Sequence, residues 1–127
     1  MFNTLEVFKI ATDMARHAGQ RQALVARNVA NADTPGFRAS TLPDFKDAYA
    51  AGPGLAQRMT RAAHLSATAE GGRAALRPTE TGEPSPNGNT VSIEDEMLNA
   101  VNVSREHSRA LTIYRHGMTV LRSALGR

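Results

Sequence analysis

The sequence lacks cysteine and tryptophan, and it has only four phenylalanines and two tyrosines among 127 residues. Without cysteine the chain has no disulfide, no thiol nucleophile and no thiolate metal ligand. With few large side chains it has little apolar area to bury against the conformational entropy that folding removes. We therefore expect partner chains to supply part of the stability.

Long apolar runs are absent as well. Glu6, Lys9, Asp13 and Arg16 interrupt the N-terminal stretch, so we expect neither a cleaved signal peptide nor a membrane-spanning helix. If the chain leaves the cytoplasm, another export signal must direct it. The 15 Lys and Arg residues exceed the 12 Asp and Glu residues, for a net charge of +3. They are scattered and form no basic run, which disfavours nucleic-acid binding.

No arrangement of side chains predicts catalysis, a cofactor or a metal site. Glu94, Asp95 and Glu96 are adjacent in sequence, so on a helix they fan around its start and do not converge as an acid–base pair. The glycine pairs lack the Gly-Lys-Ser/Thr ending of a phosphate-binding loop. The histidines do not share the helical spacing of a metal site: they are His17, His64, His107 and His116.

The chain divides into three segments, of which the first is residues 1–38. A helix is predicted over about residues 3–31, with Asn3 as its cap and Glu6 in the capping-box position. Gly19 favours close approach of another helix. An alternating three- and four-residue spacing defines one stripe of this helix: Phe8, Ala11, Ala15, Ala18, Gln22, Val25 and Val29.

The last segment, residues 91–127, predicts a longer helix over about 92–125, with Ser92 as its N-cap. Its stripe comprises Ile93, Met97, Ala100, Ser104, His107, Leu111, Tyr114, Met118, Leu121 and Leu125. Nothing else in the chain is large enough to bury this stripe, so its partners must be the first helix and other protein chains. The interface residues that we predict on the two helices are Phe8, Ala15, Val25, Met97, Leu111, Tyr114, Met118 and Leu121.

The middle segment, residues 39–90, is punctuated repeatedly by glycine and proline, and its large apolar residues are isolated. We expect it to be irregular or partly β, and mobile when the chain is alone in water. The fold class that follows is mainly α, with long N- and C-terminal helices.

The densest local motif runs from Arg27 to Ala39. Asn28 and Asn31 fall in the last helical turn, where their amides can bond freed backbone carbonyls or a neighbouring chain. Pro35 and Gly36 suit the central positions of a type II turn, and Phe37 supplies an apolar anchor after it. An ordinary helix stop accounts for Asn31, Pro35 and Gly36, but poorly for Asn28, Thr34 and Phe37 together.

This motif resembles the signature of the bacterial flagellar rod and hook family, an Asn-Ile/Val-Ala-Asn stretch followed by Thr-Pro-Gly-aromatic. The matching residues are Asn28, Val29, Ala30, Asn31, Thr34, Pro35, Gly36 and Phe37. Residues 89–97 resemble the family's Asn-x-Val-x-x-Glu-x-Glu-Met start of the C-terminal helix. The short length, the ending 121–126 and residues 60–65 are most similar to its proximal-rod members. His107 departs from the pattern, because relatives often have an aromatic residue there.

The resemblance implies a structural subunit without catalytic activity, whose terminal helices pair as an antiparallel coiled coil. It implies export through the flagellar type III apparatus without a cleaved signal, and a place in the periplasmic rod of the basal body. The expected partners are further copies, other rod subunits, the rod–ring adaptor and the membrane ring. Two alternatives stay open at this point. One is another short rod subunit or axial adaptor, and the other is a cytosolic helical regulator or nucleic-acid-binding protein.

Overall fold

The computed structural model describes residues 2–50 and 78–126. Its elements are α1 (Phe2–Ala30), β1 (Ala39–Thr41), α2 (Phe45–Ala50), β2 (Thr79–Thr81) and α3 (Ile93–Ala124). The strands β1 and β2 pair in a two-stranded sheet. One compact unit comprises Met1–Thr41 with Glu80–Arg127, and a second comprises Leu42–Thr79. Long helices at both ends of the chain and a small β element between them confirm the predicted fold class.

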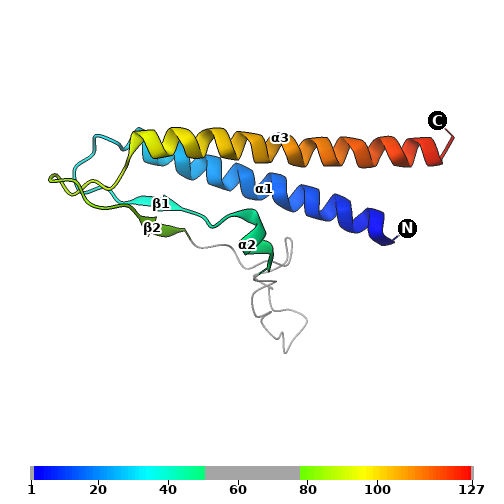
Figure 1. The fold of residues 1–127 in the computed structure, drawn as a ribbon, viewed down its shortest axis with the longest axis horizontal. Coiled ribbons are helices and arrows are strands. Elements are labelled where there is room, and N and C mark those ends of the chain that lie inside the picture. Colours follow the sequence, from blue (N-terminus) through cyan, green and yellow to red (C-terminus); the bar gives the residue numbers. More distant parts are fainter. Residues whose placement is uncertain (1, 51–77, 127) are drawn as a thin grey trace, which may run out of the picture. The chain divides into compact units, whose positions relative to one another are not determined.

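In the first unit, α1 and α3 pack side by side in antiparallel directions (Figure 1). Near the chain termini, the ring of Phe8 meets Tyr114 with ring centroids 5.2 Å apart and an interplanar angle of 74°. Near the opposite end of the pair, Asn28 of α1 bonds Glu96 of α3. Contacts at both ends therefore fix the register of the two helices.

The seam between α1 and α3 repeats every seven residues. On α1 the buried apolar residues are Ala11, Ala18 and Val25, and on α3 Val103 and Ala110 are buried. A heptad repeat of this kind keeps two helices in contact along a left-handed supercoil. The seam is thin, because the largest fully buried side chains among the described residues are Val103 and Asn28. The predicted shortage of buried apolar area is thus evident in the helical pair.

The apolar stripe predicted on α3 lies beside this seam and does not coincide with it. The α3 residues that face α1 are Glu96, Val103 and Ala110, followed seven residues later by Gly117. Glutamate, alanine and glycine are weakly hydrophobic or polar. The regular apolar spacing in the sequence is therefore carried not by the buried positions but by their neighbours on α3. These remain largely accessible: Met97 is 64% exposed and Tyr114 is 43% exposed.

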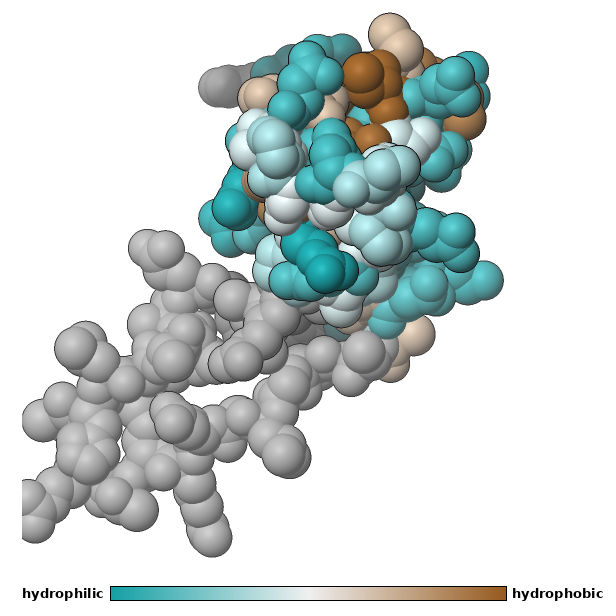
Figure 2. Space-filling model, turned by 90° about the vertical axis from the view of Figure 1, so that its left-hand side faces the viewer, coloured by the Kyte–Doolittle hydropathy of each residue, from teal (hydrophilic) through white to brown (hydrophobic). Residues whose placement is uncertain are grey.

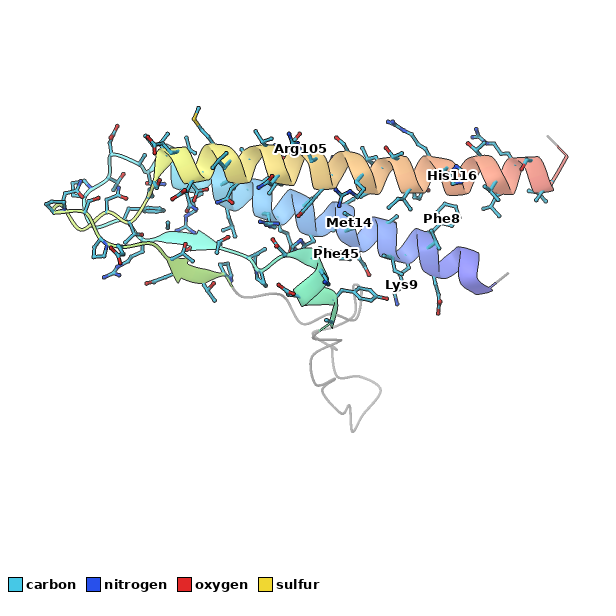
Figure 3. All side chains as sticks on the ribbon, viewed as in Figure 1. Phe8, Lys9, Met14, Phe45, Arg105 and His116 are labelled. Atoms are coloured by element: carbon cyan, nitrogen blue, oxygen red, sulfur yellow. The ribbon has the colours of Figure 1, made fainter. Side chains whose placement is uncertain are left out.

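Gly117, and not Gly19, lies against a side chain of the opposite helix. A Cβ atom built on Gly19 meets nothing within 4 Å, whereas one on Gly117 lies 2.9 Å from Cζ of Phe8. Figure 3 shows the Phe8 side chain between α1 and α3 at this level. The absence of a side chain at Gly117 therefore makes room for the phenylalanine ring.

The helix boundaries agree closely with the predictions. Ser92 is the N-cap of α3, and its side chain accepts a hydrogen bond from the Asp95 N–H. By contrast, α1 begins at Phe2, so Asn3 lies inside the helix and is not its cap. In the second unit, α2 carries Phe45 and Tyr49 with ring centroids 5.7 Å apart. Most of the predicted middle segment, including residues 60–65 with His64, lies outside the described residues.

Candidate functional site

The motif after α1 forms the predicted turn. The Phe37 N–H donates to the Thr34 carbonyl at 3.2 Å, which closes a four-residue turn with Pro35 and Gly36 at its centre. Gly36 has φ +72°, the left-handed conformation that a type II turn requires at its third residue. Glycine adopts this conformation without a Cβ penalty. The type II turn predicted from Pro35 and Gly36 is therefore confirmed.

Asn28 lies at the centre of the junction between α1, the segment after the turn, and α3. Its side chain is only 1% exposed. The Nδ2 group donates to the Ser40 carbonyl at 3.0 Å and to Oε1 of Glu96 at 2.9 Å. The Ser40 N–H donates to Asn28 Oδ1 at 3.2 Å. One buried amide thus joins three parts of the chain that are far apart in sequence.

Asn31 has a more local role than Asn28. Its Nδ2 donates to the Arg27 carbonyl at 2.8 Å, and its Oδ1 accepts from the Thr34 hydroxyl at 3.3 Å. The first bond satisfies a carbonyl in the last turn of α1, where helical partners are missing. Both bonds stay within the motif and are partly open to water.

Asn89 closes the end of α1 from the other half of the chain. Its Nδ2 lies 2.9, 2.7 and 2.8 Å from the carbonyl oxygens of Asn31, Ala32 and Thr34. An amide nitrogen has two hydrogens, so at least one of them is shared between two acceptors. The Asn89 Oδ1 accepts from the Val91 N–H at 2.7 Å. In the sequence Asn89 is recognisable only as part of the family motif, which gives no sign of this capping role.

Backbone hydrogen bonds join the turn to the loop that precedes α3. The Gly36 N–H donates to the Asn87 carbonyl, and the Thr90 N–H donates to the Phe37 carbonyl, each at 3.0 Å. The Ala39 N–H donates to the Thr90 hydroxyl at 2.8 Å. The two segments approach so closely that a Cβ on Gly88 would lie 3.4 Å from Gly36 Cα. The motif and the loop therefore form one hydrogen-bonded junction.

Glu96 is the charged member of this junction. Its side chain is 6% exposed, although Glu94 and Asp95 beside it are exposed. Its Oε1 accepts from Asn28, and its Oε2 is buried without a hydrogen-bond partner among the described residues. Glu96 lies in the first turn of α3, where the helix dipole favours negative charge. The sequence indicates that charge preference, but not the burial.

The remaining motif residues lie on the outside of the junction. Val29 is 44% exposed, and Ala30 and Pro35 are exposed as well. Phe37 is half-buried, with the Arg27 guanidinium carbon 5.8 Å from its ring centroid. The structure therefore places Asn28, Asn31, Thr34, Gly36 and the Phe37 backbone in the hydrogen-bonded junction. It leaves the side chains of Val29, Ala30 and Pro35 outside these bonds.

The predicted interface residues fall into two groups. Phe8 and Val25 contact or face α3 within the pair, and Ala15 is half-buried. The others lie on α3 and are exposed or half-buried: Met97, Leu111, Tyr114, Met118 and Leu121. A further contact that sequence reasoning missed is the ion pair of Arg21 with Glu106, at 3.1 Å. Its partners are on different helices, so helical periodicity within either one gives no sign of it.

Within residues 2–50 and 78–126, no cluster of three histidine or carboxylate side chains is suited to hold a metal ion. None of the described helices combines the length and apolar character that crossing a membrane requires.

The second half of α1 and the turn match a known class of protein. Residues 17–38, which include Asn28, Asn31 and Gly36, match the family model described as flagella basal body rod protein. A protein of this class is a structural component of the flagellar rod.

Relatives that align with 74% of the chain identify the family more narrowly. The chain is 34% identical over 103 residues to the flagellar basal body rod protein FlgB of Yersinia enterocolitica, covering 74% of each chain. It is 33% identical over 109 residues to FlgB of Yersinia ruckeri and 33% identical over 102 residues to FlgB of Salmonella typhimurium, again with 74% of each chain covered. The chain belongs to the FlgB family of flagellar basal body rod proteins. It is thus a structural subunit of the flagellar rod in the basal body and assembles with other rod components.

Proposed function

We propose that this subunit polymerises through the outward faces of α1 and α3 into the proximal rod, where it forms part of the drive shaft and of the export-channel wall. The partners in this proposal are further copies of the chain, other rod subunits, the rod–ring adaptor and the membrane ring. The chain reaches the periplasm through the flagellar type III export apparatus. It binds no nucleic acid and catalyses no reaction.

The observation that carries the proposal is the set of exposed apolar side chains at the start of α3. Ile93, Met97 and Val101 are four residues apart, so they form one row along the helix, and they are 49%, 64% and 50% exposed. Leu98 beside this row is 65% exposed. Figure 2 shows the end of the pair where α3 begins, with apolar groups gathered toward the top among polar ones. Solvent-exposed rows of apolar side chains are typical of protein–protein contact surfaces.

A second accessible set follows the C-terminal half of α3. Leu111 and Leu121 are each 37% exposed, and Leu125 is 80% exposed. Tyr114 is 43% exposed although its ring packs edge-to-face with the ring of Phe8. Because apolar surface is accessible along most of α3, contacts with more than one neighbour are favoured over a single closed dimer.

Such contacts suit an open assembly. When different surfaces of identical subunits meet head to tail and the rotation does not close, a helical filament results. Fully burying a large apolar side chain contributes about 1.5–3 kcal/mol. With 64% of Met97 still accessible, covering it contributes about 1–2 kcal/mol on the same scale. Several such side chains per subunit supplement the thin interior of the helical pair.

The proposal is tested with Met97→Lys, compared with Met97→Leu, in cells that lack the native chain. Lysine adds a charge to the apolar row but leaves the α1–α3 seam untouched, so the isolated variant keeps its helical content. We expect it to be absent from purified basal bodies and the cells to be non-motile, whereas Met97→Leu incorporates and supports motility. Incorporation of Met97→Lys at the wild-type level would show that this face is not an interface.

A further inference from the structure

We propose that Glu96 is a positioning residue: it fixes the orientation of the Asn28 amide, and thereby makes ordering of the chain after the motif turn conditional on docking of α3. The inference concerns a single folded chain, so it stands independently of the proposed polymerisation. It is carried by the hydrogen bonds that Asn28 forms with Glu96 and Ser40.

The first step is the pairing of Asn28 with Ser40. The side-chain amide donates to the Ser40 carbonyl at 3.0 Å and accepts from the Ser40 N–H at 3.2 Å. Asn28 therefore binds both polar groups of one residue, as a neighbouring strand would do in a ladder. Ser40 is the central residue of β1, so this pairing holds the strand against the end of α1.

The second step is the orientation of the amide. Rotation by 180° about the last side-chain bond would exchange its oxygen and nitrogen, and both of its bonds to Ser40 would then fail. An ionised carboxylate only accepts hydrogen bonds. Because Glu96 Oε1 lies 2.9 Å from Asn28 Nδ2, the rotated amide would place two oxygens against each other. Glu96 thus selects the one orientation that also satisfies Ser40.

Third, burial of the Glu96 carboxylate has a desolvation cost. Glu96 is 6% exposed, and its Oε2 is buried without a hydrogen-bond partner among the described residues. A buried carboxylate that is only partly satisfied adds little net stability, since the loss of hydration opposes its contacts. Glu96 is therefore better explained by the orientation it imposes than by a gain in global stability.

The fourth step is the dependence on docking. Asn28 and Ser40 are 12 residues apart, whereas Asn28 and Glu96 are 68 residues apart. The local pair can form only weakly while the amide is free to rotate and open to water. Once α3 packs on α1, Glu96 approaches Asn28 and the segment at Ser40 becomes ordered. Ordering of the chain at Ser40 thereby depends on whether the C-terminal helix is docked on α1.

The test is amide hydrogen exchange of the isolated full chain, measured by NMR for the wild type, Glu96→Leu and Glu96→Gln. Leucine has a similar volume but no acceptor, whereas glutamine keeps an acceptor and adds a donor, so it excludes the rotated Asn28 amide less strictly. In Glu96→Leu we expect the Ser40 amide to exchange about tenfold faster or more. This is the factor expected when one hydrogen bond to a charged group is lost. The amides of Val103 and Ala110 should stay within about threefold of the wild type, since local openings need not involve the whole fold.

Glu96→Gln should speed exchange at Ser40 by less than Glu96→Leu does, because glutamine keeps an acceptor but can also donate. Glu94→Gln at the exposed neighbouring position serves as the control and should keep Ser40 within about threefold of the wild type. Wild-type protection of Ser40 in Glu96→Leu would overturn the inference. An equal loss of protection at Ser40, Val103 and Ala110, including a chain that fails to fold, would also overturn it, because Glu96 would then act through global stability. Loss at Ser40 in Glu96→Gln comparable to that in Glu96→Leu would show that the acceptor is not what matters.

Discussion

Truncation of Asn28 to alanine should destabilise the chain far more than the same truncation at Asn31. Asn28 is 1% exposed and makes three side-chain hydrogen bonds, two to the Ser40 backbone and one to the Glu96 carboxylate. Asn31 is half-buried and makes two, both within the motif. The two variants lose the same atoms near the same helix end, so their comparison isolates the contacts that Asn28 makes across the junction.

The magnitude follows from these contacts. A neutral hydrogen bond contributes about 0.5–1.5 kcal/mol net, and one to a charged group about 1.5–3 kcal/mol. Asn28→Ala also leaves a buried acceptor on Glu96 and the part-buried backbone groups of Ser40 unpaired. Water can reach Ser40 in part, since it is half-buried, so we expect a loss of about 3 kcal/mol and not the larger sum of the individual bonds. For Asn31→Ala, water replaces most of the lost hydrogen bonds, and the expected decrease in the free energy of unfolding is about 1 kcal/mol.

The assay is urea unfolding of both variants and the wild type, followed by circular dichroism at dilute protein concentration. The dependence of the unfolding free energy on urea must be equal in all three for the free energies to be compared. The reasoning would be refuted by losses at Asn28 and Asn31 that agree within about 0.5 kcal/mol, the usual effect of a surface substitution.

Two further predictions concern glycines with different roles. Gly36→Val should lower stability by about 1–2 kcal/mol, because a β-branched residue is strained at φ +72°, and Gly36→Asn should lower it less; equal unfolding temperatures for the two variants would contradict this. Gly19→Ala should stabilise by about 0.5–1 kcal/mol through helix propensity. Gly117→Ala has the same intrinsic gain, but its Cβ would lie 2.9 Å from the Phe8 ring, so the melting temperature should fall. A higher melting temperature in both alanine variants would mean that the Phe8 ring moves aside without an energetic cost.

The elements that depend on local sequence could be predicted, and the structure confirms them. Ser92 caps α3 because a hydroxyl before an acidic first turn has few competing roles. Gly36 adopts positive φ because proline before it and the turn geometry leave little choice. Both long helices follow from periodic apolar residues that are not interrupted by proline. In each of these cases the determining residues are within a few positions of one another.

The contacts between the two ends of the chain could not be predicted in the same way. Asn89 and Glu96 bond residues of α1 and its motif from across the chain, and a single sequence gives no signal that pairs them. The α3 seam was missed for a different reason. Because it consists of glutamate, valine, alanine and glycine at seven-residue spacing, hydrophobicity alone selects the neighbouring stripe. That stripe, with Met97 and Leu111 among its exposed members, stays our predicted interface with other subunits.

The most direct measurement of the central claim is the accessibility of position 97 before and after assembly. Because the chain has no cysteine, Met97→Cys introduces a unique thiol that a maleimide can label. Val103→Cys provides the buried control, since Val103 is 0% exposed in the single chain. We predict rapid labelling of Met97→Cys in the isolated subunit and protection in purified basal bodies, with Val103→Cys protected in both. Equally rapid labelling of Met97→Cys in the two states would contradict the claim that neighbouring subunits cover the outward face of α3.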